Sequence, residues 1–324
     1  MALRAPLFSV VIATYNRRAL VVRAVASVLA QTFPDYELIV VDDGSDDGTA
    51  DVLRGYGDRV RVIRQSNQGP GAARNRGIAA AEGKYIAFLD SDDLWYPWTL
   101  ESYASAITRE SPAVLSGAAV CFGPDQEVPQ AEHAPVHYDC VSNYLMVDQG
   151  TAVLGSGTIV VAADLLRQIG GFSGEISVAE DTDLLIRTSI REPFILFRSP
   201  AMIACCRGSM DSVQTLDKHF VGVRYLIEKE TMGLYAGGGR LRRARRHLLA
   251  QMARNCSFRC LRAGRLQWAW WLYARTLRWQ ARDARIRYLA GFPLMAAWRV
   301  LGARGGMSRP EIPADQGRQA ESRE

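Results

Sequence analysis

The sequence predicts an α/β protein built on a mostly parallel sheet with helices on both faces. Three observations lead to this prediction. The first 110 residues contain four short runs rich in β-branched residues, each run precedes a segment with helical spacing, and the connections are short. Strands that alternate with helices in this way favour parallel pairing, because neighbouring parallel strands need a long crossover that a helix can supply.

The predicted elements follow one another in order along this first part of the chain. Strands are expected at 8–13, 37–43, 59–65 and 84–90, and helices at 17–31, 44–56, 69–83 and 98–107. The apolar residues of the first helix recur at three- and four-residue steps: Leu20, Val21, Ala24, Val25, Val28 and Leu29. The last of these helices follows Pro97, which suits a helix start.

The composition is that of an ordinary globular protein. Of the 324 residues, 48% are apolar and 23% are charged, which suits one large domain with an appendage. The six cysteines form no C-x-x-C pair, so we expect reduced thiols in a cytoplasmic protein. Residues 1–7 are too short for a signal peptide, and no uncharged apolar stretch reaches the ~20 residues of a membrane span.

Polar residues follow each predicted strand at the edge of the sheet where ligands usually bind. They are Thr14, Tyr15 and Asn16, then Asp42 and Asp43, then Asn67, and finally Asp90, Asp92 and Asp93. Because open parallel sheets bind ligands outside the carboxyl ends of their strands, we expect these side chains to converge on one site.

A glycine-rich segment, GPGAAR at 69–74, resembles a dinucleotide-binding fingerprint. It follows the third strand instead of the first, and its last position is Arg74. We expect it to open a helix whose N-terminus and Arg74 lie near phosphate.

The triplet Asp90-Ser91-Asp92 suggests a cation site. Alternate residues of a strand project to the same side, so Asp90 and Asp92 could act together while Ser91 points away. Carboxylates suit Mg²⁺ or Mn²⁺, which usually take one or two of them plus substrate phosphates. The alternative is that Asp92 and Asp93 cap the following helix or begin a turn.

Four motifs together make the sequence resemble family 2 glycosyltransferases, inverting enzymes with the GT-A fold. They are FSVVIATYNR, ELIVVDDGSDDGT, NQGPGAARNRGIAAAEGKYIAFLDSDDLW and GGFSGEISVAEDTDLLIR, in the family's order over roughly residues 7–210. The resemblance implies a catalytic domain at 1–235, with a nucleotide-binding half at about 1–110 and an acceptor half at about 111–235.

The resemblance implies roles for single residues of the nucleotide-binding half. Base and ribose of a nucleotide-sugar would lie against Ala13, Thr14, Tyr15 and the pair Asp42 and Asp43, either of which could make the main contact. Asn67, after the third strand, is expected among the nucleotide-sugar-binding residues. Asp90 would face the ribose, Asp92 would bind the Mn²⁺ or Mg²⁺ that bridges the diphosphate, and Asp93 is a weaker metal candidate.

A second acidic motif, AEDTDLLIR at 179–187, supplies the residues that would act on the acceptor. The family places its catalytic base at Asp181, and Glu180 would orient the acceptor. Acids in the first turn of a helix also interact favourably with the macrodipole, and Asp183 fits that alternative well. Arg207 either neutralises the diphosphate or is a surface arginine.

The C-terminal part of the chain differs sharply in charge. Residues 240–324 contain 19 arginines, no lysine and five acids, a net charge of +14 against +5 for the whole chain. Residues 236–305 are expected to form basic, tryptophan-rich amphipathic helices broken near Ala263 and Gly264, and residues 306–324 to be disordered.

Two interpretations of this extension are open. Its tryptophans either pack in a helical seam on the catalytic domain or attach the protein to the inner face of an anionic membrane, where lipid-linked acceptors reside. Nucleic acid is not an expected partner. The predicted function is transfer of a sugar, from UDP by family habit, to a saccharide or lipid-linked acceptor; the alternative is a catalytically silent, membrane-associated scaffold that binds nucleotide-sugar.

Overall fold

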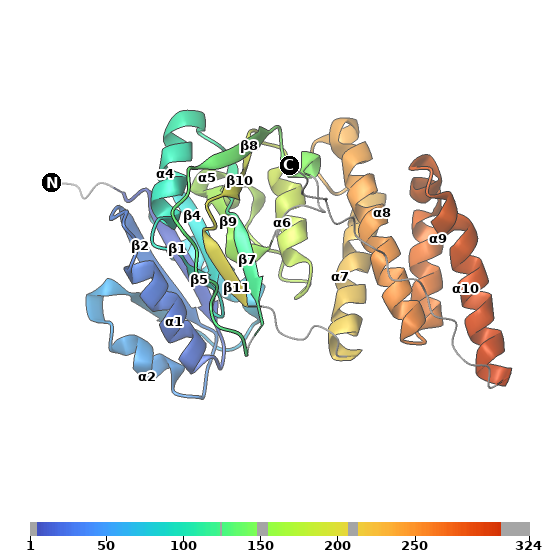
Figure 1. Ribbon diagram of the computed structural model, residues 1–324, viewed down its shortest axis with the longest axis horizontal. Helices are drawn as coiled ribbons and strands as arrows, with labels where there is room; N and C mark the ends of the chain where they lie inside the picture. Colours follow the sequence, from blue (N-terminus) through green and yellow to red (C-terminus); the bar gives the residue numbers. More distant parts are fainter. Residues whose placement is uncertain (1–4, 124, 148–154, 207–212, 306–324) are drawn as a thin grey trace, which may run out of the picture.

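The computed structural model describes residues 5–123, 125–147, 155–206 and 213–305, and it confirms the predicted α/β class (Figure 1). The strands are β1 (Phe8–Thr14), β2 (Tyr36–Asp42), β3 (Arg61–Arg64), β4 (Tyr85–Asp90), β5 (Leu94–Trp95), β6 (Val114–Ser116), β7 (Ala119–Phe122), β8 (His137–Val141), β9 (Ile159–Ala162), β10 (Phe194–Ser199) and β11 (Ile203–Cys206). The helices are α1 (Arg18–Leu29), α2 (Thr49–Arg54), α3 (Pro70–Ala80), α4 (Thr99–Glu110), α5 (Ala163–Ile169), α6 (Glu180–Thr188), α7 (Val213–Thr231), α8 (Gly238–Arg262), α9 (Leu266–Arg282) and α10 (Ile286–Gly305). The predicted tail at 306–324 lies outside the described residues.

The central sheet has eight strands in the order β3-β2-β1-β4-β9-β6-β10-β8. The four strands predicted from the sequence, β1 to β4, pair in parallel, whereas β9 runs antiparallel to both β4 and β6. In the register of these strands, Thr14 lies opposite Asp42 and Ala13 opposite Asp90. The carboxyl ends of β1, β2 and β4 therefore meet at one edge.

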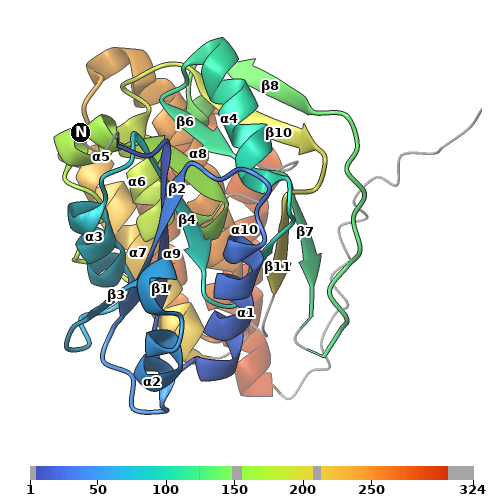
Figure 2. The same cartoon turned by 90° about the vertical axis from the view of Figure 1, so that its left-hand side faces the viewer.

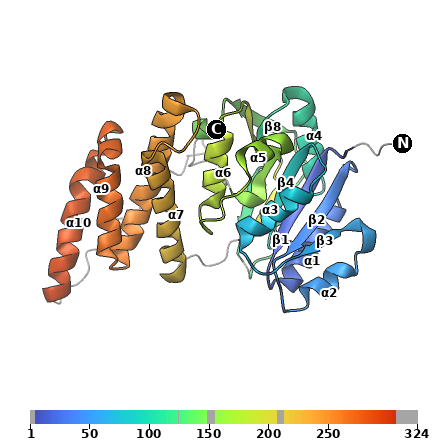
Figure 3. The ribbon, with the colours of Figure 1, turned by 180° about the vertical axis from the view of Figure 1, so that it is seen from behind.

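Helices cover both faces of this sheet, as its doubly buried strands require. One buried cluster joins the sheet to α1 and α4, and a second joins it to α3, α5 and α6. Figure 3 shows α3 and α5 on the face opposite α1 and α4. Close approach of α3 to β1 depends on Gly77, where an added Cβ would lie 2.4 Å from Val11 Cγ1.

One predicted helix is shorter than expected. The sequence predicts a helix at 44–56, but α2 begins only at Thr49. Gly44 and Gly48 have φ of +85° and +83°, a left-handed conformation that glycine adopts without steric cost. The segment between them therefore forms a loop over the end of β2.

A small second sheet, β5-β11-β7, stands beside the main one (Figure 2). Its strand β5 lies between Asp93 and α4, and the N-cap of α4 is Trp98. Asp92 and Asp93 therefore do not cap that helix, so the helix-cap alternative for them is wrong. The other alternative, a turn, is present, since the backbone N–H of Asp93 donates to the carbonyl of Asp90 at 3.0 Å.

The C-terminal helices form successive layers beyond α6, in the order α7, α8, α9 and α10 (Figure 1). As predicted, the chain breaks after Arg262, with Gly264 in the left-handed region at φ +76°. Part of the tryptophan set lies in the helical seams: the ring of Trp268 stacks on Phe220 with centroids 4.6 Å apart. Within the described ranges, no helix is both long and apolar enough to cross a bilayer.

Candidate active site

A cavity of about 550 Å³ opens where β1, β2 and β4 end. Eight of the residues predicted from the sequence line it: Ala13, Thr14, Tyr15, Asn67, Asp43, Arg74, Asp90 and Asp92. They converge because three parallel strands in register deliver their last residues to the same edge. Arg207 lies outside the described residues.

The two acids after β2 have different positions. The strand ends at Asp42, whose side chain is fully buried and does not line the cavity. Its Oδ1 accepts a hydrogen bond from the Ser45 N–H at 2.9 Å, and its Oδ2 lies 3.5 Å from Arg64 Nε. Asp42 is therefore part of the support beneath the cavity.

Asp43, the first residue beyond β2, does line the cavity. Its Oδ1 accepts from Gln65 Nε2 at 2.8 Å and from the Gln68 N–H at 3.0 Å, and its Oδ2 accepts from the Gly69 N–H at 2.8 Å. The carboxylate thus fixes the loop that leads into α3. On the facing strand the hydroxyl of Thr14 is buried and has no hydrogen-bond partner among the described residues.

Asp90 is held from two sides. Arg74 Nη2 donates to Asp90 Oδ1 at 2.8 Å, and the hydroxyl of Ser156 donates to the same oxygen at 3.1 Å. Gly157 passes so close behind the cluster that an added Cβ would lie 2.9 Å from Asp90 Oδ2 and 3.0 Å from Asp93 Oδ2. Only a residue without a side chain at position 157 leaves room for these two carboxylates.

Ser91 corrects the expectation based on strand alternation. Because β4 ends at Asp90 and the chain turns there, Ser91 does not point away: it lines the cavity together with Asp90 and Asp92. Its hydroxyl lies 3.3 Å from Arg17 Nη1, and the same guanidinium nitrogen lies 2.9 Å from Asp92 Oδ1.

The remaining two acids of the cluster have raised pKa values. Burial raises the pKa of Asp92, an effect that Arg17 partly offsets and the charge of Asp90 increases. Burial and then the charge of Asp90 raise the pKa of Asp93 to about 7. Asp93 lies outside the cavity lining, and its Oδ1 accepts from the Cys206 N–H at 2.8 Å.

These acids fit a divalent cation that draws its other ligands from substrate. Desolvation and mutual repulsion destabilise their charged forms, and a cation would relieve both. In the part of the chain that the structure describes, no three His, Cys, Asp or Glu side chains form a metal-binding group by themselves. Asp90 and Asp92 both line the cavity, but Asp90 is already held by the buried Arg74 and by Ser156. Asp92 contacts the partly exposed Arg17 and is therefore the better suited of the two.

Arg74 connects this cluster to α6. Its Nη1 lies 3.2 Å from Glu180 Oε1, opposite the contact to Asp90, and its guanidinium carbon lies 5.2 Å from the centre of the Phe172 ring. Burial alone would lower the pKa of Arg74, but the charges of Asp90 and Glu180 outweigh it and raise that pKa. A buried, permanently charged arginine therefore joins the two acidic motifs.

Glu180 and Asp181 begin α6 and are not among the residues that line the cavity; Glu180 is connected to it through Arg74. Burial and the neighbouring charge of Asp181 raise the pKa of Glu180 to about 7. Burial also raises the pKa of Asp181, whose Oδ1 accepts from the Thr182 N–H at 2.6 Å. The charge of Arg74 lowers the pKa of Asp181 and the charge of Asp90 raises it. The Asp181 carboxylate therefore interacts electrostatically with the charged groups at the cavity.

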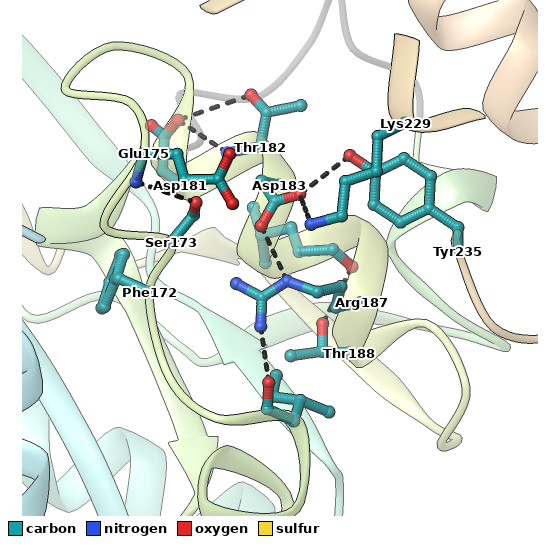
Figure 4. Close-up of polar contacts among 12 residues, drawn as sticks. Phe172, Ser173, Glu175, Asp181, Thr182, Asp183, Arg187, Thr188, Lys229 and Tyr235 are labelled. Carbon is teal, nitrogen blue, oxygen red and sulfur yellow. Dashed lines mark hydrogen bonds and ion pairs between the residues drawn. The ribbon is translucent and has the colours of Figure 1, made fainter. Parts of the chain in front are cut away.

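Asp183 lies in the first turn of α6, as expected of a helix-start charge, and it has a second role as well (Figure 4). It is fully buried and accepts from Arg187 Nε at 2.7 Å, from Lys229 Nζ at 2.9 Å and from Tyr235 Oη at 2.8 Å. Lys229 belongs to α7, and Tyr235 lies in the connection to α8. Asp183 therefore fastens the helix that carries Asp181 to the C-terminal helices.

Two cations at the cavity were not predicted. Arg17 is the last residue of the FSVVIATYNR motif, and its place directly after a strand-end loop was a usable signal. Lys218 comes from α7 and also lines the cavity. Nothing local in the sequence indicates that role for Lys218, because it depends on how α7 packs.

Comparison with known proteins agrees with this geometry. Residues 9–163 match the model of glycosyl transferase family 2. An uncharacterized glycosyltransferase of Nostoc sp. is 41% identical over 128 residues, which cover 38% of this chain and 40% of the relative. A Bacillus subtilis glycosyltransferase named for teichuronic acid biosynthesis, TuaG, is 42% identical over 112 residues, covering 33% of this chain and 44% of the relative. The chain thus spans less than half the length of these relatives.

Solved structures share the fold at low identity. Staphylococcus aureus TarS 1–349 in complex with UDP-GlcNAc superposes with a TM-score of 0.56 at 19% identity, covering 86% of this chain and 92% of that one. The mannosyltransferase PcManGT of Pyrobaculum calidifontis in complex with GDP-Man and Mn²⁺ gives 0.56 at 16% identity, covering 93% and 87%. Residues 9–163 are therefore similar to glycosyl transferase family 2, and the fold is of the GT-A type.

Proposed function

We propose that the protein is a metal-dependent, inverting glycosyltransferase that moves a sugar from a nucleoside diphosphate to a saccharide or lipid-linked acceptor. The observation that carries the proposal is the joining of two acidic motifs by one buried arginine. Asp90 and Glu180 are 90 positions apart in sequence, and both contact Arg74 beside a cavity of a suitable size for a small molecule.

The donor would occupy the cavity at the strand ends. Asp43 and the unpartnered hydroxyl of Thr14 offer polar groups for the base and ribose, in line with the predicted roles of Ala13, Tyr15 and Asn67. Arg17 and Lys218 bring positive charge to the same wall, which suits a diphosphate.

Asp92 would hold the divalent cation, and Asp93 is less suited because it lies behind the cavity wall. When bound, the cation would stabilise the negative charge that grows on the diphosphate as the sugar leaves. Arg17, which contacts Asp92 here, would keep that carboxylate aligned with the cavity wall.

Asp181 would act as the general base. An acceptor hydroxyl forms a bond to the anomeric carbon as the bond to the diphosphate oxygen breaks, and its proton passes to the Asp181 carboxylate. A raised pKa brings this base nearer to the pH at which it must accept a proton. Glu180 would orient the acceptor, and Arg74 would hold the Glu180 carboxylate in place.

The relative named for teichuronic acid biosynthesis suggests an acceptor in cell-envelope polysaccharide synthesis. The neighbours with bound UDP-GlcNAc and GDP-Man suggest which donors to try first. We propose UDP as the nucleotide of the donor.

The direct test is thermal stabilisation by UDP, GDP and dTDP with and without Mn²⁺. A ligand at ~100 times its dissociation constant adds ~2.7 kcal/mol to the native state, a measurable shift. Asp92→Asn is expected to abolish the Mn²⁺-dependent part, whereas the control Asp58→Asn, an exposed acid away from the cavity, should behave like wild type.

Two outcomes would contradict the proposal. Equal nucleotide affinity of Asp92→Asn and wild type in Mn²⁺ would remove the metal role of Asp92. Binding of donor without any transfer to saccharide or lipid-linked acceptors would instead favour a silent scaffold.

A further inference from the structure

A second cavity, of about 490 Å³, lies between α8 and α9 near the end of α7. Five arginines contribute to its lining: Arg243 and Arg246 from α8, and Arg275, Arg278 and Arg282 from α9. The three on α9 are spaced by three and four residues, so they form one face of that helix. Both helices therefore direct their basic side chains into the same space.

Most of this positive charge is not balanced by nearby acids. Asp283, the acid at the cavity, contacts His247 Nδ1 at 2.8 Å. Glu230 lies 3.0 Å from Arg246 Nε, but its other oxygen is engaged by the buried Arg245 at 2.7 Å.

The other four arginines have no carboxylate partner among the residues whose side chains are described. Arg275 lies over the ring of Trp271 at 5.6 Å, and Arg243, Arg278 and Arg282 form no ion pair with any side chain in the described part of the chain. Like charges around one hollow repel each other, and an anion would relieve that repulsion.

The use of arginine instead of lysine indicates which kind of anion the cavity would bind. Residues 240–324 contain 19 arginines and no lysine, and the planar guanidinium fork matches the oxygens of phosphate in a bidentate manner. Trp279 and Leu277 give the same cavity an apolar wall, and Arg246 lies over the Trp279 ring at 5.5 Å. Phosphate attached to an organic group fits such a lining.

The second cavity is separate from the candidate donor site. Lys218 lines the first cavity and Thr231 the second, and both residues belong to α7. At 1.5 Å per residue, 13 residues of helix separate them by about 20 Å. A phosphate bound between α8 and α9 is therefore not the diphosphate of a donor in the first cavity.

We propose that the cavity between α8 and α9 is a second anion site that binds a phosphate group of a ligand other than the sugar donor. The phosphate belongs either to a soluble molecule or to a lipid headgroup. This inference does not depend on the chemistry proposed at the strand ends.

The experiment uses the full chain and two matched double variants. Arg278→Ala with Arg282→Ala removes two charges from the cavity, and Arg242→Ala with Arg262→Ala removes two exposed charges of α8 outside it. The probes are inorganic diphosphate, measured by calorimetry without divalent cations, and vesicles of phosphatidylglycerol or phosphatidylcholine, measured by sedimentation.

We expect diphosphate to bind the cavity variant at least tenfold more weakly than the control variant, since one charge-assisted hydrogen bond is worth roughly a factor of ten. If the cavity variant loses binding of diphosphate but not of phosphatidylglycerol vesicles, the ligand is a soluble phosphate compound. If it loses binding of phosphatidylglycerol vesicles, the ligand is a lipid headgroup. Any contribution of the first cavity is the same in both variants.

Thermal unfolding keeps the test decisive if the cavity variant changes stability. Without phosphate, removing two repelling charges should leave the melting temperature unchanged or raise it, and added diphosphate should stabilise the control but not the cavity variant. The proposal is overturned if neither probe distinguishes the two variants.

Discussion

Replacing Asp183 by asparagine tests how strongly the C-terminal helices are fastened to the candidate catalytic helix. The substitution keeps the shape of the side chain and removes its charge. In the structure that charge is fully buried and faces Arg187, Lys229 and the hydroxyl of Tyr235 (Figure 4). Asparagine can still accept one or two of these hydrogen bonds, but both cations lose their counter-charge.

The expected loss of unfolding free energy is about 3 kcal/mol. Removing one partner of a buried ion pair costs ~3–5 kcal/mol because an uncompensated charge remains. The side chains of Arg187 and Lys229 are 15% and 17% exposed, so both can reach water in part, and the lower end of that range applies.

Tyr235→Phe is the matched control, since it removes one hydrogen bond to the same carboxylate and leaves the charges paired. It should cost about 1.5 kcal/mol. Urea unfolding followed by circular dichroism measures both variants under the same conditions. If Asp183→Asn costs no more than Tyr235→Phe, the buried charge is not what holds α6 to α7, and the reasoning fails.

The remaining predictions concern the site itself. Asp181→Asn should lower turnover by ~10² or more while sparing donor binding, as loss of a general base does; near-normal turnover in a sugar-transfer assay would exclude that role. Glu180 has its pKa raised to about 7, so its contribution to stability is fully present below the unfolded-state pKa and is lost as pH rises to about 7. The stability of wild type relative to Glu180→Gln should therefore fall between about pH 4.5 and 7, and a pH-independent difference in metal-free melting curves would count against it. Gly157→Ala should weaken nucleotide binding by displacing Asp90 and Asp93, and unaltered affinity in calorimetry would show that the loop can move aside.

Much of the site could be predicted because its residues follow strands. In a parallel sheet the carboxyl ends meet whatever the details of packing, so the side chains after β1, β2 and β4 had to gather. This reasoning does not predict at which residue each strand ends, and a difference of one residue changes the role of a side chain. Asp42 and Asp43 differ in role because β2 ends between them, and Ser91 enters the cavity because β4 ends just before it.

Other features could not be predicted because they depend on distant partners. Asp183 had the local pattern of a helix-start charge, but its partners Lys229 and Tyr235 are 46 and 52 residues away. Lys218 reaches the cavity only through the packing of α7. A sequence pattern reports the neighbours of a residue along the chain, and both residues act through neighbours in space.

The tryptophans of the C-terminal extension show how the two interpretations left open by the sequence can each apply to different residues. Trp268 and Trp271 contact Phe220 of α7, so their rings are used in packing between helices. Trp270 and Trp298 remain 41% and 39% exposed. Attachment to a membrane stays a prediction. Trp270 also packs edge to face on Phe292 of α10 at 5.2 Å, so Trp298 is the better candidate to enter an interface without disrupting the seam. Substituting Trp298 by alanine should therefore weaken vesicle binding and spare stability, whereas Trp268→Ala should cost stability in any solvent.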